Sequence, residues 1–414
     1  MFTLAFIVFL LSDIAMRLWL ASRQVRHVQQ HRAAVPPEFS DRISLYSHQR
    51  AADYTAAKMR VAIIERVTEA AVLVAFTLLG GLQFLDLQLG YLIDNEMLRQ
   101  LSLIGVVLAL LGVVGLPFSI WKRFRLEARF GFNRITPRLF ALDALKTLFL
   151  SLVLGTPLVA SVLWIMGNAG ANWVWWAWAI WVGFNLLILW LFPTVIAPLF
   201  NKFTPLNNPE MAKRIHGLAQ RCGFSLSGLF VMDGSRRSAH GNAYFTGFGK
   251  ARRIVFFDTL LARLNVDEIE AVLAHELGHF KHKHILKRMA ASFGIALVFA
   301  LVLGWLSSQV WFYVELGVLP QLGRPNDALA LILFFLVVPV FTFWLTPLFS
   351  WFSRRDEFQA DHYAAQQCSA DALVSALVKL YDDNAATLTP DPVHSAFYDS
   401  HPPAVIRIQN LKHG

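Results

Sequence analysis

Cysteine and charged residues are both scarce in this chain of 414 residues. The two cysteines, Cys222 and Cys368, provide no disulfide framework and no Cys-x-x-Cys motif, and we interpret them as reduced thiols. Charged residues make up 16% of the sequence, whereas a soluble domain usually has about a quarter. Hydrophobic residues reach 56%, and the mean hydropathy is +0.48. This composition predicts a polytopic membrane protein.

The apolar residues are gathered into seven stretches, each long enough to cross a bilayer, which takes about 20 helical residues. No basic residue precedes the first stretch, so we expect a retained helix and not a cleaved signal peptide. The stretches cover residues 2–21, 66–86, 101–121, 139–166, 173–199, 289–312 and 328–353.

The lysines and arginines alternate between the connections of these stretches. A net charge of +9 would suggest a nucleic-acid partner in a soluble protein, but here the charge follows the membrane spans, and we expect no nucleic acid. The positive-inside rule then predicts an N-terminus outside and a C-terminus on the cytoplasmic side. Seven, six, fourteen and five Lys or Arg lie in 22–65, 122–138, 200–288 and 354–414, against one, none and one in 87–100, 167–172 and 313–327.

One helical pattern carries residues typical of a metalloprotease. It opens at Asn265, with Glu268 three residues later, as in a capping box. His275 and His279 are four residues apart, so both project from one face and can share a zinc ion. Glu276 lies beside them, where it can reach a zinc-bound water. The alternative is a basic amphipathic surface helix that happens to be rich in histidine.

Two further histidines follow in the same stretch. If the helix continues, His282 lies about 10 Å along the axis from His275, too far to share one metal ion with it. His284 would point to the opposite side. A longer histidine motif would place a third histidine at position 285, where the chain has Ile285. We therefore expect His282 and His284 at the membrane interface and a third ligand from elsewhere.

The segment 353–365 offers that ligand. Glu357 and Asp361 are four residues apart on a second helical pattern. Glu357 can ligate zinc, and Asp361 can accept a hydrogen bond from a ligand histidine. Taken alone, the pair would be read as solvated acids beside Arg354 and Arg355. Topology favours the metal site, because the sixth and seventh spans form an antiparallel pair that returns both helix ends to the cytoplasmic side.

Short β-branched and aromatic runs precede the histidine helix, at 228–234, 242–248 and 252–258. Glycine-containing turns separate them, and we predict a small antiparallel sheet. An exposed edge there can bind a peptide in extended form, although a plain structural hairpin fits equally well.

The C-terminal tail contains candidates for an oxyanion donor, which stabilises the tetrahedral intermediate of peptide hydrolysis. These are His394, His401 and Arg407.

Together these residues resemble the integral-membrane CAAX prenyl proteases, which are zinc endopeptidases. The resemblance runs through most of the chain in order. Its matching stretches are EARFGFNRIT (127–136), IAPLFNKFTPL (196–206), DGSRRSAHGNAYFTG (233–247), LAHELGH (273–279), EFQAD (357–361) and SHPPAVIRI (400–408).

The resemblance implies an α-helical membrane protein with seven helices around a water-filled chamber and a cytoplasmic zincin-like domain that contains a small β-sheet. It divides the chain into spans 1–5 (1–200), a catalytic region (201–287), spans 6–7 (288–353) and the C-terminal part of the catalytic domain (354–414). His394 has no match. The implied roles are one zinc ion on His275, His279 and Glu357, general base Glu276, supporting carboxylate Asp361, substrate strand Asn242 and Ala243, and oxyanion donors His401 and Arg407.

We therefore predict an endopeptidase in which zinc activates a water molecule, acting near the C-terminus of a lipidated or membrane-associated peptide. The short loops and tail favour a bacterial inner membrane over the endoplasmic reticulum. One alternative is a quality-control protease acting on unlipidated membrane proteins. Another is a transporter or lipid-binding protein with a structural zinc, because ionisable residues lie in or near the spans. These are Asp13, Glu69, Asp143 and Lys146.

Overall fold

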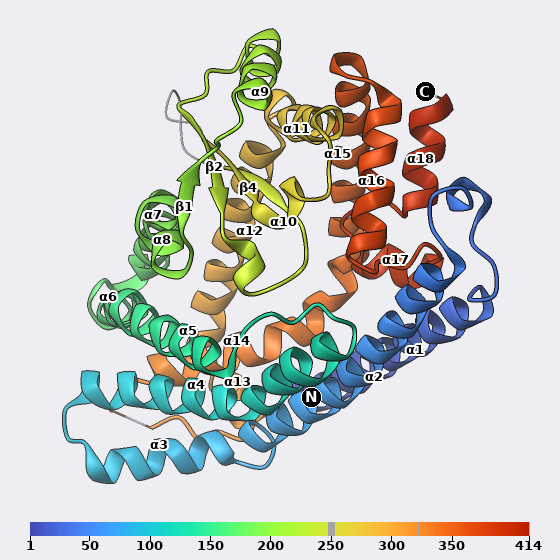
Figure 1. The fold of residues 1–414 in the computed structure, drawn as a ribbon. Helices are drawn as coiled ribbons and strands as arrows, with labels where there is room; N and C mark the ends of the chain where they lie inside the picture. Colours follow the sequence, from blue (N-terminus) through green and yellow to red (C-terminus); the bar gives the residue numbers. More distant parts are fainter. Residues whose placement is uncertain (247–252, 322, 414) are drawn as a thin grey trace.

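The computed structural model describes residues 1–246, 253–321 and 323–413 (Figure 1). The N-terminal half of this chain is helical. Its helices are α1 (Phe2–Gln30), α2 (Leu45–Phe76), α3 (Gly81–Leu92), α4 (Glu96–Trp121), α5 (Pro137–Leu150), α6 (Thr156–Asn168), α7 (Trp173–Leu191) and α8 (Ala197–Phe200).

The second half combines a small sheet with further helices. The sheet region contains β1 (Phe203–Pro205), α9 (Pro209–Arg221), β2 (Gly228–Met232), β3 (Ala243–Thr246), β4 (Arg253–Phe257), α10 (Asp258–Leu261) and α11 (Val266–Lys281). It is followed by α12 (His284–Ser307), α13 (Val310–Val314), α14 (Asp327–Thr342), α15 (Thr346–Gln367), α16 (Ala370–Asp383), α17 (Pro392–Tyr398) and α18 (Ala404–His413).

Six helical stretches within the described residues are long and apolar enough to cross a membrane. The predicted seventh span is reached when α2 and α3 count as one, but this pair is bent by 53°. Within the predicted span 66–86 the helix breaks at 77–80, where Gly80 adopts a φ of +75°. The six stretches are Phe2–Gln30, Glu96–Glu127, Pro137–Asn168, Gly170–Phe200, His284–Ser307 and Asp327–Gln367.

The spans differ in how much of their surface the protein itself covers. In Asp327–Gln367, which begins with α14, 50% of the apolar window is buried, whereas the other five have at most 28%. Leu329, Leu333 and Val337 of α14 are almost fully buried. α14 is thus the packed centre of the membrane region. The remaining spans leave most of their apolar surface uncovered by protein and available to lipid.

The sheet is mixed, which corrects the prediction of an antiparallel one. Its strand order is β1-β2-β4-β3, and β2 pairs with β4 in parallel, while β1 and β3 pair antiparallel with their neighbours. After β2 the chain forms β3 at the far edge of the sheet. It then returns as β4, which lies between β2 and β3 and runs in the same direction as β2. Of the predicted strands 242–248 and 252–258, residues 247, 248 and 252 lie outside the described part. β3 and β1 form the two edges of the sheet.

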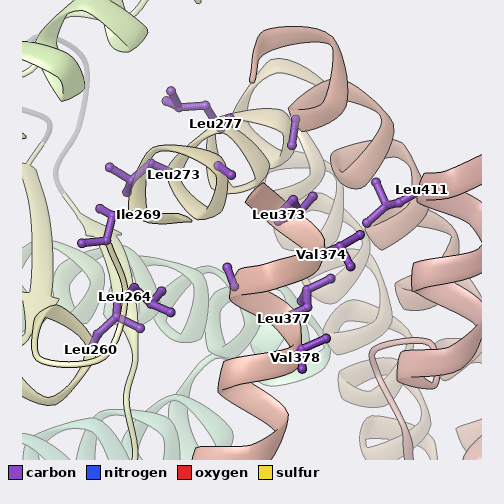
Figure 2. Close-up of a cluster of buried hydrophobic side chains, with 14 of the residues drawn as sticks. Leu260, Leu264, Ile269, Leu273, Leu277, Leu373, Val374, Leu377, Val378 and Leu411 are labelled. Atoms are coloured by element: carbon purple, nitrogen blue, oxygen red, sulfur yellow. The ribbon is translucent and has the colours of Figure 1, made fainter. Parts of the chain in front are cut away.

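A hydrophobic core holds α11 in place between the sheet region and the C-terminal helices. Its side chains come from α9, β2, β4, α10, α11, α15, α16 and α18, and Figure 2 shows part of them converging around the apolar faces of α11 and α16. Since all are buried, each of the larger apolar side chains contributes on the order of 1.5–3 kcal/mol through burial. Members labelled in Figure 2 include Leu264, Ile269, Leu273, Leu277, Leu373, Leu377 and Leu411.

The stretch that begins as α11 does not continue into the membrane as one helix. α11 ends at Lys281, and α12 begins at His284. Between them Lys283 has a φ of +58°, a left-handed conformation that interrupts a helix. The assumption of a continuous helix, from which His284 was expected to point away from the metal ligands, is therefore wrong.

α11 and α15 pack closely because one residue has no side chain. A Cβ atom on Gly278 would lie 2.9 Å from Ala360 Cα and 3.1 Å from Ala360 O. These distances are shorter than ordinary van der Waals contact, so only glycine permits this separation of the two helix backbones.

We predict that Gly278→Ala destabilises the protein by about 1–3 kcal/mol, because the added methyl group forces α11 and α15 apart. The matched control is Gly217→Ala in α9, where the Cβ meets only the end of the Arg221 side chain, at 3.7 Å. There the better helix propensity of alanine applies, and stability stays equal or rises. Thermal unfolding in detergent measures both, and equal shifts would contradict the close-packing account.

Candidate metal centre

Three side chains from two helices converge at one point. His275 and His279 lie on α11, one turn apart, and Glu357 lies on α15. The two Nε2 atoms are 3.2 Å apart. Glu357 Oε2 lies 3.4 Å from His275 Nε2, and Glu357 Oε1 lies 3.3 Å from His279 Nε2. The predicted ligands therefore meet, although 78 residues separate His279 from Glu357.

The triangle fits a tetrahedral metal ion. Bonds of about 2.0–2.1 Å to zinc require ligand atoms roughly 3.3–3.4 Å apart, which the observed separations match. Glu357 Oε2 is buried and has no hydrogen-bond partner within the described chain. A buried carboxylate oxygen left unpaired is costly, and a metal ion at this point would satisfy it.

α11 presents its ligands from a well-defined start. The Asn265 side chain accepts a hydrogen bond from the backbone N–H of Glu268, and Glu268 accepts one from the backbone N–H of Asn265. This is the predicted capping box. Glu268 also accepts from Lys379 of α16 at 2.8 Å, which ties the beginning of α11 to that helix.

Asp361 supports the first ligand. His275 Nδ1 lies 2.8 Å from Asp361 Oδ1, although the ring N–H is not well enough aligned for a standard hydrogen bond. Burial disfavours a charged His275, but Asp361 and Glu357 outweigh it and raise the pKa of His275 to about 9. A metal ion bound here therefore displaces a proton.

Arg407 of α18 holds Asp361 in turn. Its Nε donates to Asp361 Oδ2 at 2.8 Å, and a second guanidinium nitrogen donates to Asp361 Oδ1. Nη1 lies further away, 3.8 Å from Glu357 Oε2. The Arg407 side chain is only 5% exposed, and its hydrogen bonds go to Asp361. Arg407 therefore orients the metal ligands indirectly, through Asp361.

The second ligand has a supporting partner that the sequence analysis missed. His279 Nδ1 lies 3.0 Å from His284 Nδ1, and His284 Nε2 lies 2.9 Å from Gln359 Oε1. His284 is 1% exposed, so it is not the interface residue that we expected. The break at Lys283 turns its ring back toward the site. The sequence carries no plain signal of that break, since lysine rarely adopts a left-handed conformation.

His282 lies beside this pair and does not join the triangle. Its ring stacks on the His284 ring, with the centroids 5.5 Å apart. His282 is the residue that caps the C-terminal end of α11, and it does not belong to the group of possible metal ligands. This agrees with the expectation that His282 is not a ligand.

Glu276 lies next to the triangle and is free to act on a bound molecule. The described chain gives its carboxylate no hydrogen bond or ion pair. Burial raises the pKa of Glu276 above its ordinary value; the nearby His275 and His279 lower it, and the charge of Glu357 raises it. A carboxylate with a raised pKa accepts a proton more readily, which suits a general base.

His401 approaches the triangle from the other side. It lies in the loop between α17 and α18, and its Nε2 is 3.5 Å from Glu357 Oε2. Ser400 Oγ contacts its Nδ1 at 3.0 Å. With 60% of its side chain exposed, His401 can reach a substrate. His394, the candidate without a family match, packs on the Tyr398 ring within α17.

The predicted substrate strand lies over the histidine helix. The Phe245 ring of β3 is 5.3 Å from the Phe280 ring, one residue beyond His279. Asn242 precedes β3 and is exposed, and its Oδ1 accepts from Ala243 N at 2.8 Å. β3 pairs with β4 on one side, and no strand of the described chain covers its other edge.

The four ionisable residues singled out in or near the spans each have a partner in the described chain. Asp13 accepts from Arg17 at 2.7 Å, and Glu69 accepts from Arg66 at 2.6 Å. Asp143 accepts from Arg237 at 2.8 Å, which connects α5 to the segment before β3. Lys146 donates to the Leu199 carbonyl oxygen at 2.7 Å. These contacts give each group a structural role. The main argument for the alternative of a transporter, which was the presence of ionisable residues in the spans, is therefore removed.

Comparisons with known proteins cover both halves of the chain. Residues 24–202 match the family described as CAAX prenyl protease N-terminal, five membrane helices, and residues 205–414 match peptidase family M48. CAAX prenyl protease 1 of Saccharomyces cerevisiae is 31% identical over 97% of this chain and 93% of its own. CAAX prenyl protease 1 homolog of Arabidopsis thaliana is 38% identical over 77% of this chain and 74% of its own. The crystal structure of S. mikatae Ste24p superposes with a TM-score of 0.93 at 29% identity, over 100% of this chain and 99% of that one.

We predict that His284→Ala lowers the affinity for Zn²⁺ by about 10-fold or more, because His279 loses the partner that orients its ring. His216→Ala is the control, since His216 is exposed on α9 and bonds only to Ala212 of the same helix. Competition with a chromogenic chelator measures affinity, and thermal midpoints show that both variants fold. Unchanged affinity in a folded His284→Ala protein would contradict the assignment.

Proposed function

The chain belongs to the CAAX prenyl protease family of M48 peptidases, and from this premise we propose that His275, His279 and Glu357 hold one catalytic Zn²⁺ beside Glu276 as general base. It is an integral, multi-pass membrane metalloprotease that acts on peptides or proteins. The observation that carries the proposal is the triangle of three ligand atoms next to a carboxylate that has no other partner in the described chain.

Two histidines and one glutamate suit zinc in a catalytic setting. A structural zinc site usually has four protein ligands, whereas three leave one position for water or substrate. When bound, zinc polarises the scissile carbonyl and lowers the pKa of a water molecule in that position. Glu276 takes a proton from the attacking water and later passes it to the leaving nitrogen.

We assign the oxyanion to His401, whose exposed ring faces the ligands from the α17–α18 loop. Arg407 acts differently from the role first expected. Since its guanidinium is engaged on Asp361, it positions the carboxylate that orients His275, and its charge favours the whole anionic cluster.

The substrate is proposed to add as a strand along the open edge of β3, beside Asn242 and Ala243. Asn242 O accepts from Phe257 N at 2.9 Å, so this group faces β4. Hydrogen-bonding direction alternates along an antiparallel strand, and the main-chain groups of Ala243 and Phe245 therefore face the open edge. They are available to a peptide in extended form.

The relatives compared above are named as CAAX prenyl proteases, and we propose a prenylated peptide, cut near its C-terminus, as the substrate. Main-chain recognition at β3 would also accept other sequences. Quality control of unlipidated membrane proteins is therefore the rival task for the same chemistry.

We further propose that the N-terminus lies outside and the catalytic domain on the cytoplasmic side. The Lys and Arg distribution supports this orientation. So does the hydrogen bond at 2.7 Å from the backbone N–H of Thr3, in the first span, to Glu315, which follows the sixth span in a connection assigned to the outer side. The short loops favour a bacterial inner membrane, with the endoplasmic reticulum as the alternative, since the relatives compared are from eukaryotes.

We predict that Glu276→Gln lowers kcat by about 10²–10⁴-fold while the protein keeps one zinc per chain, because the amide cannot accept the proton of the attacking water. Peptidase assays and elemental analysis on the same purified sample measure both quantities. Full activity with zinc bound would sink the assignment of the base.

The lipid requirement is tested with a farnesylated peptide and its unlipidated twin. A CAAX-type enzyme should cleave the farnesylated peptide at least about 10-fold more efficiently in kcat/KM, because burying each CH₂ group of the lipid contributes about 0.8 kcal/mol. Equal cleavage of the twins would instead support the quality-control task.

A further inference from the structure

A cavity adjoins the metal centre. Its volume is about 490 Å³, within the range of ligand-binding pockets. It lies between α2 and the segment that runs from the end of α16 through α17 to the start of α18, two regions that lie side by side in Figure 1. His401 lines this cavity and also lies 3.5 Å from Glu357. His401 therefore lies between the cavity and the metal ligands.

The chain direction of β3 determines which end of the substrate points toward this cavity. Antiparallel strand pairs outnumber parallel ones two- to three-fold, and a peptide added antiparallel to β3 runs from Thr246 toward Ala243. Its C-terminal residues then continue past Asn242 toward His240, which lines the cavity. The residues on the leaving side of the scissile bond thus extend into this space.

Three groups that line the cavity have hydrogen-bonding capacity to spare. Lys58 of α2 is exposed and has no carboxylate within ion-pair distance in the described chain; its ammonium lies 5.0 Å from the centre of the Tyr54 ring. The hydroxyl of Tyr381 makes no hydrogen bond there either. Asn384 uses its Oδ1 on His240 Nδ1, at 2.8 Å, and keeps its amide N–H groups available.

Two acidic residues, Glu127 and Asp399, lie at or next to the cavity. Glu127 accepts a hydrogen bond from Tyr54 and lies 3.5 Å from His240 Nε2, and the charge of Lys58 also acts on it. Asp399 lines the cavity; its backbone carbonyl oxygen accepts from Arg354 at 2.9 Å, and its carboxylate remains charged. An ammonium, a hydroxyl and an amide N–H, all donors, form a set suited to a carboxylate.

We propose that this cavity binds the free C-terminal carboxylate of the substrate, through an ion pair with Lys58 and hydrogen bonds from Tyr381 and Asn384. The inference rests on the proposed function and explains how the enzyme would choose its cut. An extended peptide spans about 3.3 Å per residue, so anchoring the carboxylate beyond His401 fixes which peptide bond lies at the metal.

The experiment uses the full-length, zinc-loaded protein in detergent with two farnesylated peptides of one sequence. One ends in a free carboxylate and the other in a carboxamide. The wild-type protein should cleave the free acid at least about 10-fold more efficiently in kcat/KM, since a charge-assisted hydrogen bond is lost with the amide. Lys58→Met should bring the rate for the free acid down toward the rate for the amide, and Tyr381→Phe should reduce the preference by several-fold.

Lys213→Met is the matched control, because Lys213 is exposed on α9 and has no role in either site. It should keep the wild-type preference. Equal cleavage of acid and amide by the wild-type protein, or an unchanged preference in a folded Lys58→Met protein that retains zinc, would overturn the carboxylate site. If the wild-type protein cleaves neither peptide, the proposed function itself fails, and this outcome is distinct from cleavage of both at the same rate.

Discussion

The close contact between α11 and α15 is the constraint on which the rest of the active region depends. Two ligands lie on one helix and the third on the other, and their separations of 3.2–3.4 Å tolerate little displacement. Gly278 permits this approach to Ala360, and both helices bury apolar faces in the same core. Since protein interiors are densely packed, a change in the spacing of the two helices would be felt directly at the ligand atoms.

Each histidine of the triangle contacts a different group of supporting residues through its Nδ1 atom. Asp361 and Arg407 support His275 from α15 and α18, whereas His284 and Gln359 support His279 from α12 and α15. α12 and α15 are also continuous with the membrane-spanning stretches. The positions of the metal ligands are therefore coupled to the membrane-spanning helices through the residues that support them.

Much of the architecture could be predicted from the sequence because its signals are local. Long apolar stretches identified the spans, and the spacing of His275 and His279 put them on one helical face. The pairing with Glu357 followed from topology together with a family resemblance. Three features escaped prediction, the bend at 77–80, the parallel pairing of β2 with β4 and the left-handed Lys283. Glycine permits a positive φ without requiring one, lysine rarely adopts one, and the parallel pairing joins strands that are not consecutive in the chain. The role of His284 was missed for the same reason, since it follows from the turn at Lys283 and not from the sequence period.

X-ray absorption at the zinc K edge, on the purified full-length protein, tests the central claim most directly. We expect one zinc per chain with nitrogen and oxygen neighbours at about 2.0–2.1 Å, two of them imidazoles, and no sulfur. Glu357→Gln should weaken or abolish this signal. Zinc bound through sulfur, or an unchanged zinc environment in the Glu357→Gln protein, would contradict the assignment of His275, His279 and Glu357 as the metal ligands.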